Sequence, residues 1–329
     1  MTRREFLAAL VGAAPLRLRA ALAQQTEKVR RIGVLIGWSD SDPMRRDWVA
    51  AFVEELARLG WADGRDATIK IAWTNLDANR ESILAKELVA SRPDVLVCTT
   101  TGTAALLHQA TSAIPIVFAV VADPVGAGLV ASFAHPGGNI TGFTSMAAAT
   151  SHAKLFDLLK QIAPGIKRGG IMFNPDTAPD GGKIYLDAFE AAARSLGAEP
   201  MILPVRSDPE IETSVGREQG GLVVMNDPFF AGAHMETVVS ATRRNNVPAI
   251  YEAAPFAARG GLMSYGADRA DILRHAAGYV DRILRGDSPA DLPVQTPSKF
   301  KLTINLTTAK ALGLEIPPSL LAAADEVIE

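Results

Sequence analysis

The chain has 329 residues, which is enough for two domains with hydrophobic cores of their own. Its 48% hydrophobic and 21% charged residues are typical of a globular protein. A net charge of −3 and only 6% aromatic residues argue against the basic, base-stacking surface of a nucleic-acid-binding protein. A single cysteine, Cys98, excludes an internal disulfide, and its place after an apolar run predicts a buried side chain.

Residues 1–23 have the features of a cleaved export signal. Arg3 and Arg4 precede a short apolar segment at residues 6–16, which is too short to span a bilayer, and residues 21–23 form a small-x-small cleavage site. The paired arginines favour the twin-arginine route; the alternatives are the general secretory route and retention as a membrane helix. Without this segment, 29 of the 33 basic and 35 of the 36 acidic residues remain, a net charge of about −6.

Beyond the signal, short β-branched runs alternate with helical periodicity, a pattern typical of βαβ units around a parallel sheet. In the first half, Pro43 suits the first turn of a helix and Gly60 suits its end. We expect strands there at residues 32–36, 67–73, 94–100, 114–122 and 139–144, and helices at residues 43–59, 83–88 and 101–109.

The same alternation restarts after Thr144. Apolar residues at helical spacing predict helices around residues 155–162, 185–196, 209–219, 235–242 and 268–285. Between and after them we expect strands at residues 170–173, 200–205, 221–225, 248–251, 261–266 and 300–306, and short helices near Pro317.

This pattern predicts an α/β fold of two doubly wound, Rossmann-like lobes. We expect lobe 1 at residues 29–144 plus 267–306, lobe 2 at residues 145–266, and a C-terminal tail at residues 307–329 that packs on the lobes. Residues 139–144 would cross to lobe 2 and residues 261–266 would return. In such sheets a ligand binds at the carboxyl ends of the strands.

The stretch at residues 114–144 is interpreted as one wall of a cleft. A buried run leads into a glycine-rich mouth, and no Asp or Glu occurs at residues 124–156. Its glycines formally fit a dinucleotide fingerprint, but the acidic residue needed about 20 positions later is missing, and Pro124 occupies the start of the turn. Nucleotide binding is therefore disfavoured.

Two polar features flank this mouth. Thr100, Thr101 and Thr103 lie at an expected helix N-terminus, where hydroxyl and N–H groups favour a carboxylate; an ordinary helix cap is the alternative. Asp123 follows the buried strand and could receive an ammonium group; an Asx turn is the alternative.

In the second lobe, polar and aromatic residues follow the expected strands. Tyrosines with an apolar body and a polar tip suit a ligand wall, although packing within the lobe is the alternative. The residues expected at this edge are Asn174, Asn226, Asp227, Tyr251 and Tyr265.

The residues that could perform catalysis or bind metal form no recognisable set. Ser151 and Lys154 match S-x-x-K, but the companion motifs are absent, and the five histidines form no H-x-x-x-H pair. We therefore expect no catalytic residue, no metal and no cofactor.

Several segments resemble the ABC transporter substrate-binding proteins of the tryptophan/tyrosine-type group. They include IPIVFAVVADPVGAGLVASFAHPGGNITGF at residues 114–143, FNPDTAP at 173–179, GGLMSYG at 260–266, and residues 29–37 and 291–329. The resemblance implies a type I periplasmic-binding-protein fold with three crossing strands and no catalysis. The ligand contacts that it implies are Ser39, Asp40, Thr100 to Thr103, Asp123, Asn174, Asn226, Asp227, Tyr251 and Tyr265.

These observations predict an exported, periplasmic, monomeric receptor that closes on a small amino-acid-like or aromatic carboxylate. It would deliver this ligand to an ABC permease in the inner membrane. Thr100 to Thr103 would hold the carboxylate, and Asp123 would hold an amine. The alternatives are a ligand sensor without transport and an enzyme that uses the same cleft.

Overall fold

The structure, a computed structural model, describes residues 29–329 except residues 76, 146–149, 218–219 and 226. The expected export signal at residues 1–23 lies outside the described residues. Within the described ranges, no helix combines the length and the apolar character that a membrane crossing requires.

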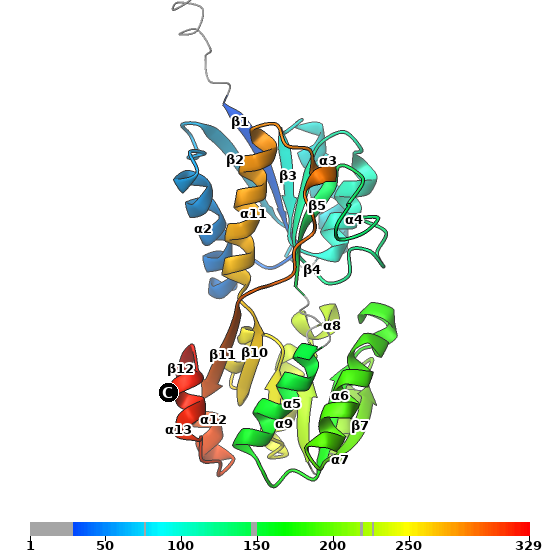
Figure 1. Ribbon diagram of the computed structural model, residues 1–329, viewed down its shortest axis with the longest axis vertical. Coiled ribbons are helices and arrows are strands. Elements are labelled where there is room, and N and C mark those ends of the chain that lie inside the picture. Colours follow the sequence, from blue (N-terminus) through cyan, green and yellow to red (C-terminus); the bar gives the residue numbers. More distant parts are fainter. Residues whose placement is uncertain (1–28, 76, 146–149, 218–219, 226) are drawn as a thin grey trace, which may run out of the picture.

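Lobe 1 is built on a parallel sheet, with strand order β2-β1-β3-β4-β5 over the described residues. Helices α2 (Pro43–Arg58) and α11 (Arg269–Leu284) cover one face, and α3 (Ala78–Ala90) and α4 (Thr101–Ala110) cover the other (Figure 1). Because both faces are covered, the central strands are continuous apolar runs. The strands are β1 (Arg30–Ile36), β2 (Ala67–Trp73), β3 (Val95–Cys98), β4 (Ile116–Val121) and β5 (Ile140–Thr144).

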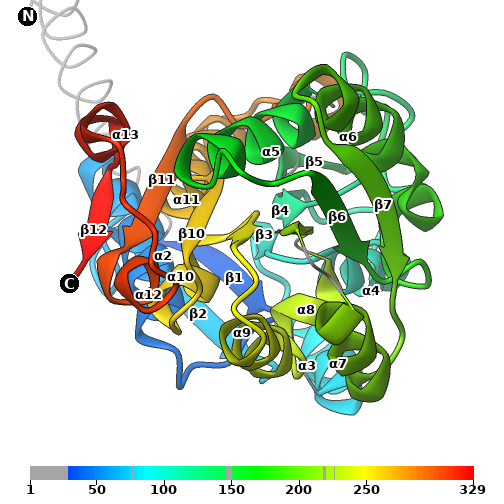
Figure 2. The ribbon, with the colours of Figure 1, turned by 90° about the horizontal axis from the view of Figure 1, so that it is seen from below.

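Lobe 2 is built on a second sheet, with the described strands in the order β12-β11-β10-β9-β8-β6-β7. Seen from below, α5 (Thr150–Ile162) and α6 (Lys183–Ser195) lie on one side, and α7 (Asp208–Arg217) and α9 (Met235–Arg244) on the other (Figure 2). The strands are β6 (Arg168–Phe173), β7 (Glu199–Pro204), β8 (Gly221–Val224), β9 (Ala249–Tyr251), β10 (Met263–Ala267), β11 (Phe300–Asn305) and β12 (Glu326–Ile328).

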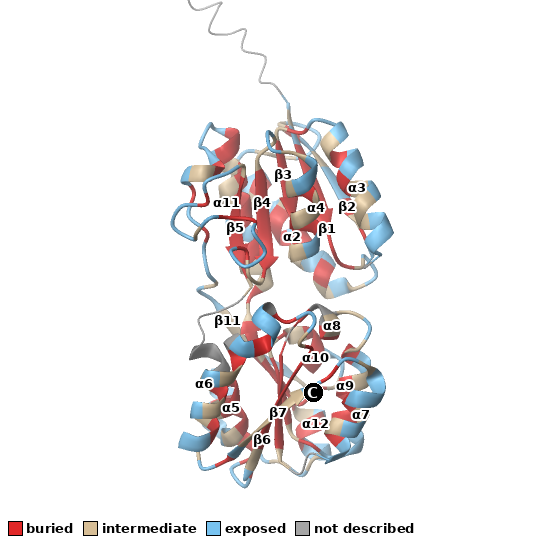
Figure 3. Cartoon of the chain, turned by 90° about the vertical axis from the view of Figure 1, so that its right-hand side faces the viewer, coloured by how far each residue is buried: buried red, intermediate tan, exposed pale blue. Residues whose placement is uncertain are grey.

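Short elements complete the fold. They are the helices α8 (Pro228–Ala231), α10 (Ala254–Ala258), α12 (Leu306–Ala311) and α13 (Pro318–Ala323), and the 3₁₀ turns η1 (Pro179–Gly182) and η2 (Pro289–Asp291). Figure 3 shows buried residues along the strands of each lobe and exposed residues on the outer helices. Each lobe therefore has a core of its own.

The ends of α2 illustrate how local chemistry sets the elements. Asp42 caps the helix by accepting a hydrogen bond from the main-chain N–H of Met44 at 3.1 Å, and Pro43 occupies the first turn. Gly60 follows the helix with φ of 100°, a left-handed conformation that glycine adopts without steric cost. The helix therefore begins and ends close to the predicted residues.

The predicted α/β fold with two doubly wound lobes is confirmed, but one boundary was wrong. Residues 300–306 were expected in lobe 1, whereas β11 pairs antiparallel with β10 in the sheet of lobe 2, with Tyr265 opposite Leu302. An apolar alternation predicts a strand but carries no information on which sheet it joins. The tail follows β11 and packs against the core of lobe 2.

The crossing strand was also misplaced. β5 was expected to carry the chain across the hinge, yet it lies in the sheet of lobe 1 beside β4, and the chain leaves lobe 1 only after Thr144. The chain returns between β10 and α11 and crosses again before β11 (Figure 1). The prediction missed α8, α10 and β12, which have three to five residues and are too short to show a period.

Candidate functional site

A cavity of about 650 Å³ lies between the lobes, at the carboxyl ends of the lobe 1 strands. Its volume is in the range of small-molecule sites. It is lined by Gly37, Trp38, Ala78, Glu81, Thr99, Thr100, Thr101, Gly102, Val120, Ala122 and Ser145 from lobe 1 and the crossing, by Thr177, Phe229, Gly232, Ala233 and His234 from lobe 2, and by Arg269.

The threonine-rich loop forms part of the lobe 1 wall and also caps α4. The Thr100 hydroxyl accepts from the Thr103 N–H at 3.2 Å, and the Thr103 hydroxyl accepts from the Thr100 N–H at 3.1 Å. This reciprocal capping box satisfies the cap alternative. Thr100, Thr101 and Gly102 line the cavity, whereas the Thr103 side chain is buried in the lobe.

Glu81 of α3 lies beside this helix N-terminus. A β-carbon at Gly102 would be 3.5 Å from Glu81 Oε2, and the Thr74 hydroxyl donates to Glu81 Oε1 at 3.2 Å. Burial raises the pKa of the Glu81 carboxyl, with Asp77 adding to the rise and the Thr74 hydrogen bond opposing it. A ligand carboxylate at Thr100 to Gly102 would therefore face an acidic neighbour.

Arg269, the first residue of α11, supplies a positive charge to the cavity. Its guanidinium lies over the ring of Trp48 at 5.7 Å, and Trp48 makes an edge-to-face contact with Trp38 at 5.5 Å. Burial lowers the pKa of Arg269 to about 10, and Arg45 adds to the lowering while Glu252 opposes it. The guanidinium remains charged at neutral pH and is positioned to bind a carboxylate.

The lobe 2 wall is aromatic. Phe229 of α8 stacks on the His234 ring with centroids 3.8 Å apart, and both residues line the cavity. The ring of His234 is held by a hydrogen bond to Asp208, with its Nδ1 2.7 Å from Asp208 Oδ1. The hydrogen bond to His234 lowers the pKa of Asp208. This arrangement suits an apolar or aromatic ligand group.

Asp227 organises this wall from beneath. Its carboxylate accepts from the main-chain N–H of Asn174 at 2.8 Å and of Phe230 at 3.1 Å, and it caps α8. Burial raises the pKa of Asp227, and the hydrogen bonds it accepts oppose the rise. Asn174 is also buried, and its side chain accepts from the Asp176 N–H at 2.8 Å. The structure therefore places both predicted site residues behind the wall rather than on it.

Asp123 lies in a turn beside the cavity. Its Oδ1 accepts from the Gly126 N–H at 2.8 Å, and a β-carbon at Gly126 would overlap the carboxylate. This is the Asx-turn alternative. Ala122 lines the cavity, but Asp123 is not among the lining residues.

Ser39 and Asp40 lie beyond the main cavity. Ser39 lines a smaller, polar cavity of about 180 Å³ that shares Gly232 and Ala233 with the main one. Asp40 is exposed, and its N–H donates to the side chain of Asn75.

The lobes are joined beside this smaller cavity. Asp42 of lobe 1 forms an ion pair with Arg259 of lobe 2 at 3.3 Å and another with the buried Arg45 at 3.3 Å. The two lobes are therefore in contact on this side of the cavity.

The predicted tyrosines and Asn226 have different positions. Tyr251 is fully buried, stacks on Phe256 and shares a 2.8 Å hydrogen bond with Thr242, as the packing alternative implies. Tyr265 stacks on Phe300 at 5.6 Å, close to the hinge. Asn226 lies outside the described residues.

Several residues that line the cavity were not predicted from the sequence, although some of them lie where a sequence signal points. Trp38 directly follows the first strand, Arg269 follows the expected return strand, and Phe229 follows the exit loop at Asp227. Trp38 and Arg269 lie two residues beyond the ends of β1 and β10, and Phe229 lies five residues beyond the end of β8, all near the strand ends that the switch-point rule selects. Glu81 has no such signal, because it lies one turn inside a helix.

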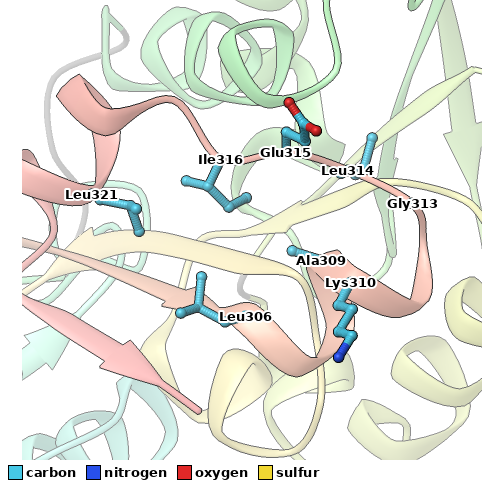
Figure 4. A pocket seen from close by; sticks show the side chains of 8 residues that line it. All are labelled: Leu306, Ala309, Lys310, Gly313, Leu314, Glu315, Ile316 and Leu321. Atoms are coloured by element: carbon cyan, nitrogen blue, oxygen red, sulfur yellow. The ribbon is translucent and has the colours of Figure 1, made fainter.

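A second cavity lies in the C-terminal tail. Figure 4 shows the aliphatic side chains of Leu306, Ile316 and Leu321 around it, with the charged ends of Lys310 and Glu315 at its rim. Its volume is about 430 Å³, and α12 and α13 form it within lobe 2, away from the hinge. It lacks the convergent polar groups of the cavity between the lobes. In the described part of the chain, no cluster of three or more His, Cys, Asp or Glu side chains could hold a metal ion.

Two doubly wound lobes around a ligand-sized cavity define a two-lobed binding protein with the type I periplasmic-binding-protein fold. The chain belongs to the ABC transporter substrate binding protein family, whose model matches residues 38–328.

Three relatives support this assignment. A tyrosine-binding protein of Clostridioides difficile (strain R20291) is 27% identical over 266 residues, which cover 80% of this chain and 76% of that protein. An ABC domain from Streptococcus pneumonia, solved in complex with L-Trp, is 30% identical with a TM-score of 0.79 and covers 92% of this chain and 100% of that one. The ligand-free, open structure of a substrate-binding protein with adhesive properties from Clostridium difficile is 26% identical with a TM-score of 0.74, covering 91% and 99%.

Proposed function

We propose that this chain is the exported substrate-binding component of an ABC importer and that its ligand is an amino acid with an aromatic side chain. The observation that carries the proposal is the composition of the cavity between the lobes. Glu81 and Arg269 give it opposite charges, and Trp38 and Phe229 give it aromatic walls from the two lobes.

The ligand would bind with each of its groups opposite a complementary one. Its carboxylate would pair with Arg269, and its ammonium group with Glu81, which replaces Asp123 as the acidic partner because Asp123 is engaged in its turn. The aromatic group would lie against Phe229. Contacts to both lobes stabilise a closed state, since a ligand shifts the equilibrium toward the state that it binds better. The relatives named above, a tyrosine-binding protein and an ABC domain in complex with L-Trp, support this ligand class.

A thermal-shift screen tests the ligand class, because binding to the folded state raises the melting temperature by mass action. The probes are L-tryptophan, L-tyrosine and L-phenylalanine, the matched acids without an amine (indole-3-propionate, phenylpropionate), tryptamine, and D-glucose. We expect shifts from the amino acids, smaller shifts from the acids and none from glucose. A shift from glucose alone would overturn the proposal, and equal shifts from the acids and amino acids would remove the ammonium contact.

Export and delivery to a permease complete the proposed role. The supporting observations are the paired Arg3 and Arg4, the cleavage site before Gln24 and the membership of the family. In cells we expect a periplasmic product that begins at Gln24, and a variant with both arginines changed to lysine should remain unprocessed. Deleting the gene should slow uptake of the labelled amino acid; unchanged uptake would contradict the transport role.

A further inference from the structure

Val120, near the end of β4, has an unusual backbone conformation. Its φ is 63°, in the left-handed region that β-branched residues rarely occupy because of steric conflict with the backbone. The side chain is only 7% exposed and packs in the apolar cluster beneath α11, so Val120 belongs to the hydrophobic core and not to an exposed turn. Such conformations persist only where the surrounding structure enforces them, and they cluster at functional sites.

The strand pairing explains how the conformation arises. Ala119 pairs with Phe143 and Val121 pairs with Thr144 on β5, so Val120 is an extra residue at a β-bulge. On the other side, the pairing of β4 with β3 ends at Phe118. The peptide group of Val120 therefore lies outside the registers of both neighbouring strands.

The bulge lies where the ligand cavity meets the hinge. Val120 and Ala122 line the cavity, and the Val121 carbonyl accepts from the N–H of Ser145, the first residue of the crossing, at 2.9 Å. A bulge re-aims the strand beyond it. Here the segment beyond the bulge lines the cavity and also accepts the hydrogen bond from the crossing segment.

We propose that Val120 is a positioning residue of the binding site. Its left-handed conformation turns one peptide group, with its N–H and C=O, out of the sheet and toward a polar group of the ligand. The bulky side chain anchors this conformation in the core, so the wall is already in place before the ligand arrives. This inference rests on the proposed function, because it assumes an amino acid in the cavity.

Comparing Val120→Gly with Val120→Ala isolates the conformation from the loss of the side chain. Both variants lose the isopropyl group, but only glycine adopts a left-handed φ without cost. In ligand-free protein we expect Val120→Gly to unfold at the same urea concentration as Val120→Ala, or at a higher one. The matched control is Val117, which is buried in the same strand and pairs with Thr141 in regular register. There we expect the usual order, with glycine less stable than alanine.

Calorimetric titration with L-tryptophan tests the positioning role. Because both variants lack the side chain that anchors the conformation, we expect each to bind roughly fivefold more weakly than the wild-type chain, the effect of one hydrogen bond. A Val120→Gly variant that is less stable than Val120→Ala, or that fails to fold, overturns the strained conformation. Wild-type affinity in both variants overturns the positioning role. A wild-type chain that binds none of the aromatic amino acids instead contradicts the proposed function, and the unfolding comparison still decides the conformation.

Discussion

The wall that lobe 1 gives to the ligand cavity consists of strand ends and helix starts, whereas the wall from lobe 2 consists mainly of α8 and the loop that follows it. In lobe 1, regular elements position the polar groups of Thr100 and Glu81 directly. In lobe 2, a four-residue helix holds Phe229, and the carboxylate of Asp227 holds that helix. The lobe 1 wall therefore presents charged and polar groups held by regular elements, whereas the lobe 2 wall presents an apolar surface held by the hydrogen bonds of one carboxylate.

The first test of this comparison removes the positive charge of Arg269, which lies in the cavity beside the hinge. Arg269→Met should raise the Kd for an aromatic amino acid more than a hundredfold, about 3 kcal/mol, because the ligand carboxylate would lose its charged partner in a desolvated site. Calorimetric titration measures the effect. Arg274→Met on the same helix is the control, because Arg274 does not line this cavity. Similar losses in both variants would contradict a direct contact with Arg269.

The second test removes the support of the lobe 2 wall. Asp227→Ala leaves the N–H groups of Asn174 and Phe230 unpaired and removes the cap of α8. We expect the free energy of unfolding to fall by about 2–3 kcal/mol in urea titrations. Asp176→Ala, which removes an exposed ion pair with Arg206, is the control and should change stability by less than about 0.5 kcal/mol. If both variants lose the same stability, Asp227 does not organise the wall.

The third test removes the apolar cover itself. Phe229→Ala should weaken the binding of aromatic amino acids about tenfold and should reduce the preference for them over leucine, because the buried aromatic contact is lost. Competition titrations with both ligand types measure this ratio. Phe133→Ala removes a partly exposed ring outside the cavity and should leave affinity and preference unchanged. An unaltered preference in Phe229→Ala would place the aromatic group elsewhere.

The smallest expected effect concerns the acid of lobe 1. Glu81→Gln should weaken the binding of an amino acid about fivefold but should not weaken that of the matched acid without an amine. Burial raises the pKa of Glu81, so wild-type affinity should fall as pH decreases through this raised pKa, starting above the ordinary glutamate range, and the variant should lack this step. Asp123→Asn is the control. Loss of affinity in Asp123→Asn, with none in Glu81→Gln, would restore Asp123 as the ammonium partner.

Most of the fold could be predicted because periodicity and end signals agree. The apolar run before Cys98, the proline and glycine around α2, and the spacing along α11 each correspond to the observed element. The sheet to which β11 belongs could not be predicted, because strand patterns do not encode the partner strand when two similar sheets are available.

The site was predicted as a region rather than as a set of side chains. The switch-point rule selects the loop with Thr100 and the exit of β4. It does not tell which of the side chains there face the cavity. Asp123 instead bonds to its own turn, and Tyr251 faces the core. That distinction depends on hydrogen bonds formed only when distant segments meet.

The position of Arg269 has a mechanical consequence. α11 has 16 residues and is therefore about 24 Å long, and it packs along lobe 1 beside α2. It starts directly after β10 leaves the sheet of lobe 2, so a hinge rotation between the lobes would turn this helix about residues 267–268. A rotation of about 10° there would displace the far end of a helix of this length by about 4 Å. A ligand bound to Arg269 would therefore act close to the point about which the lobes would turn.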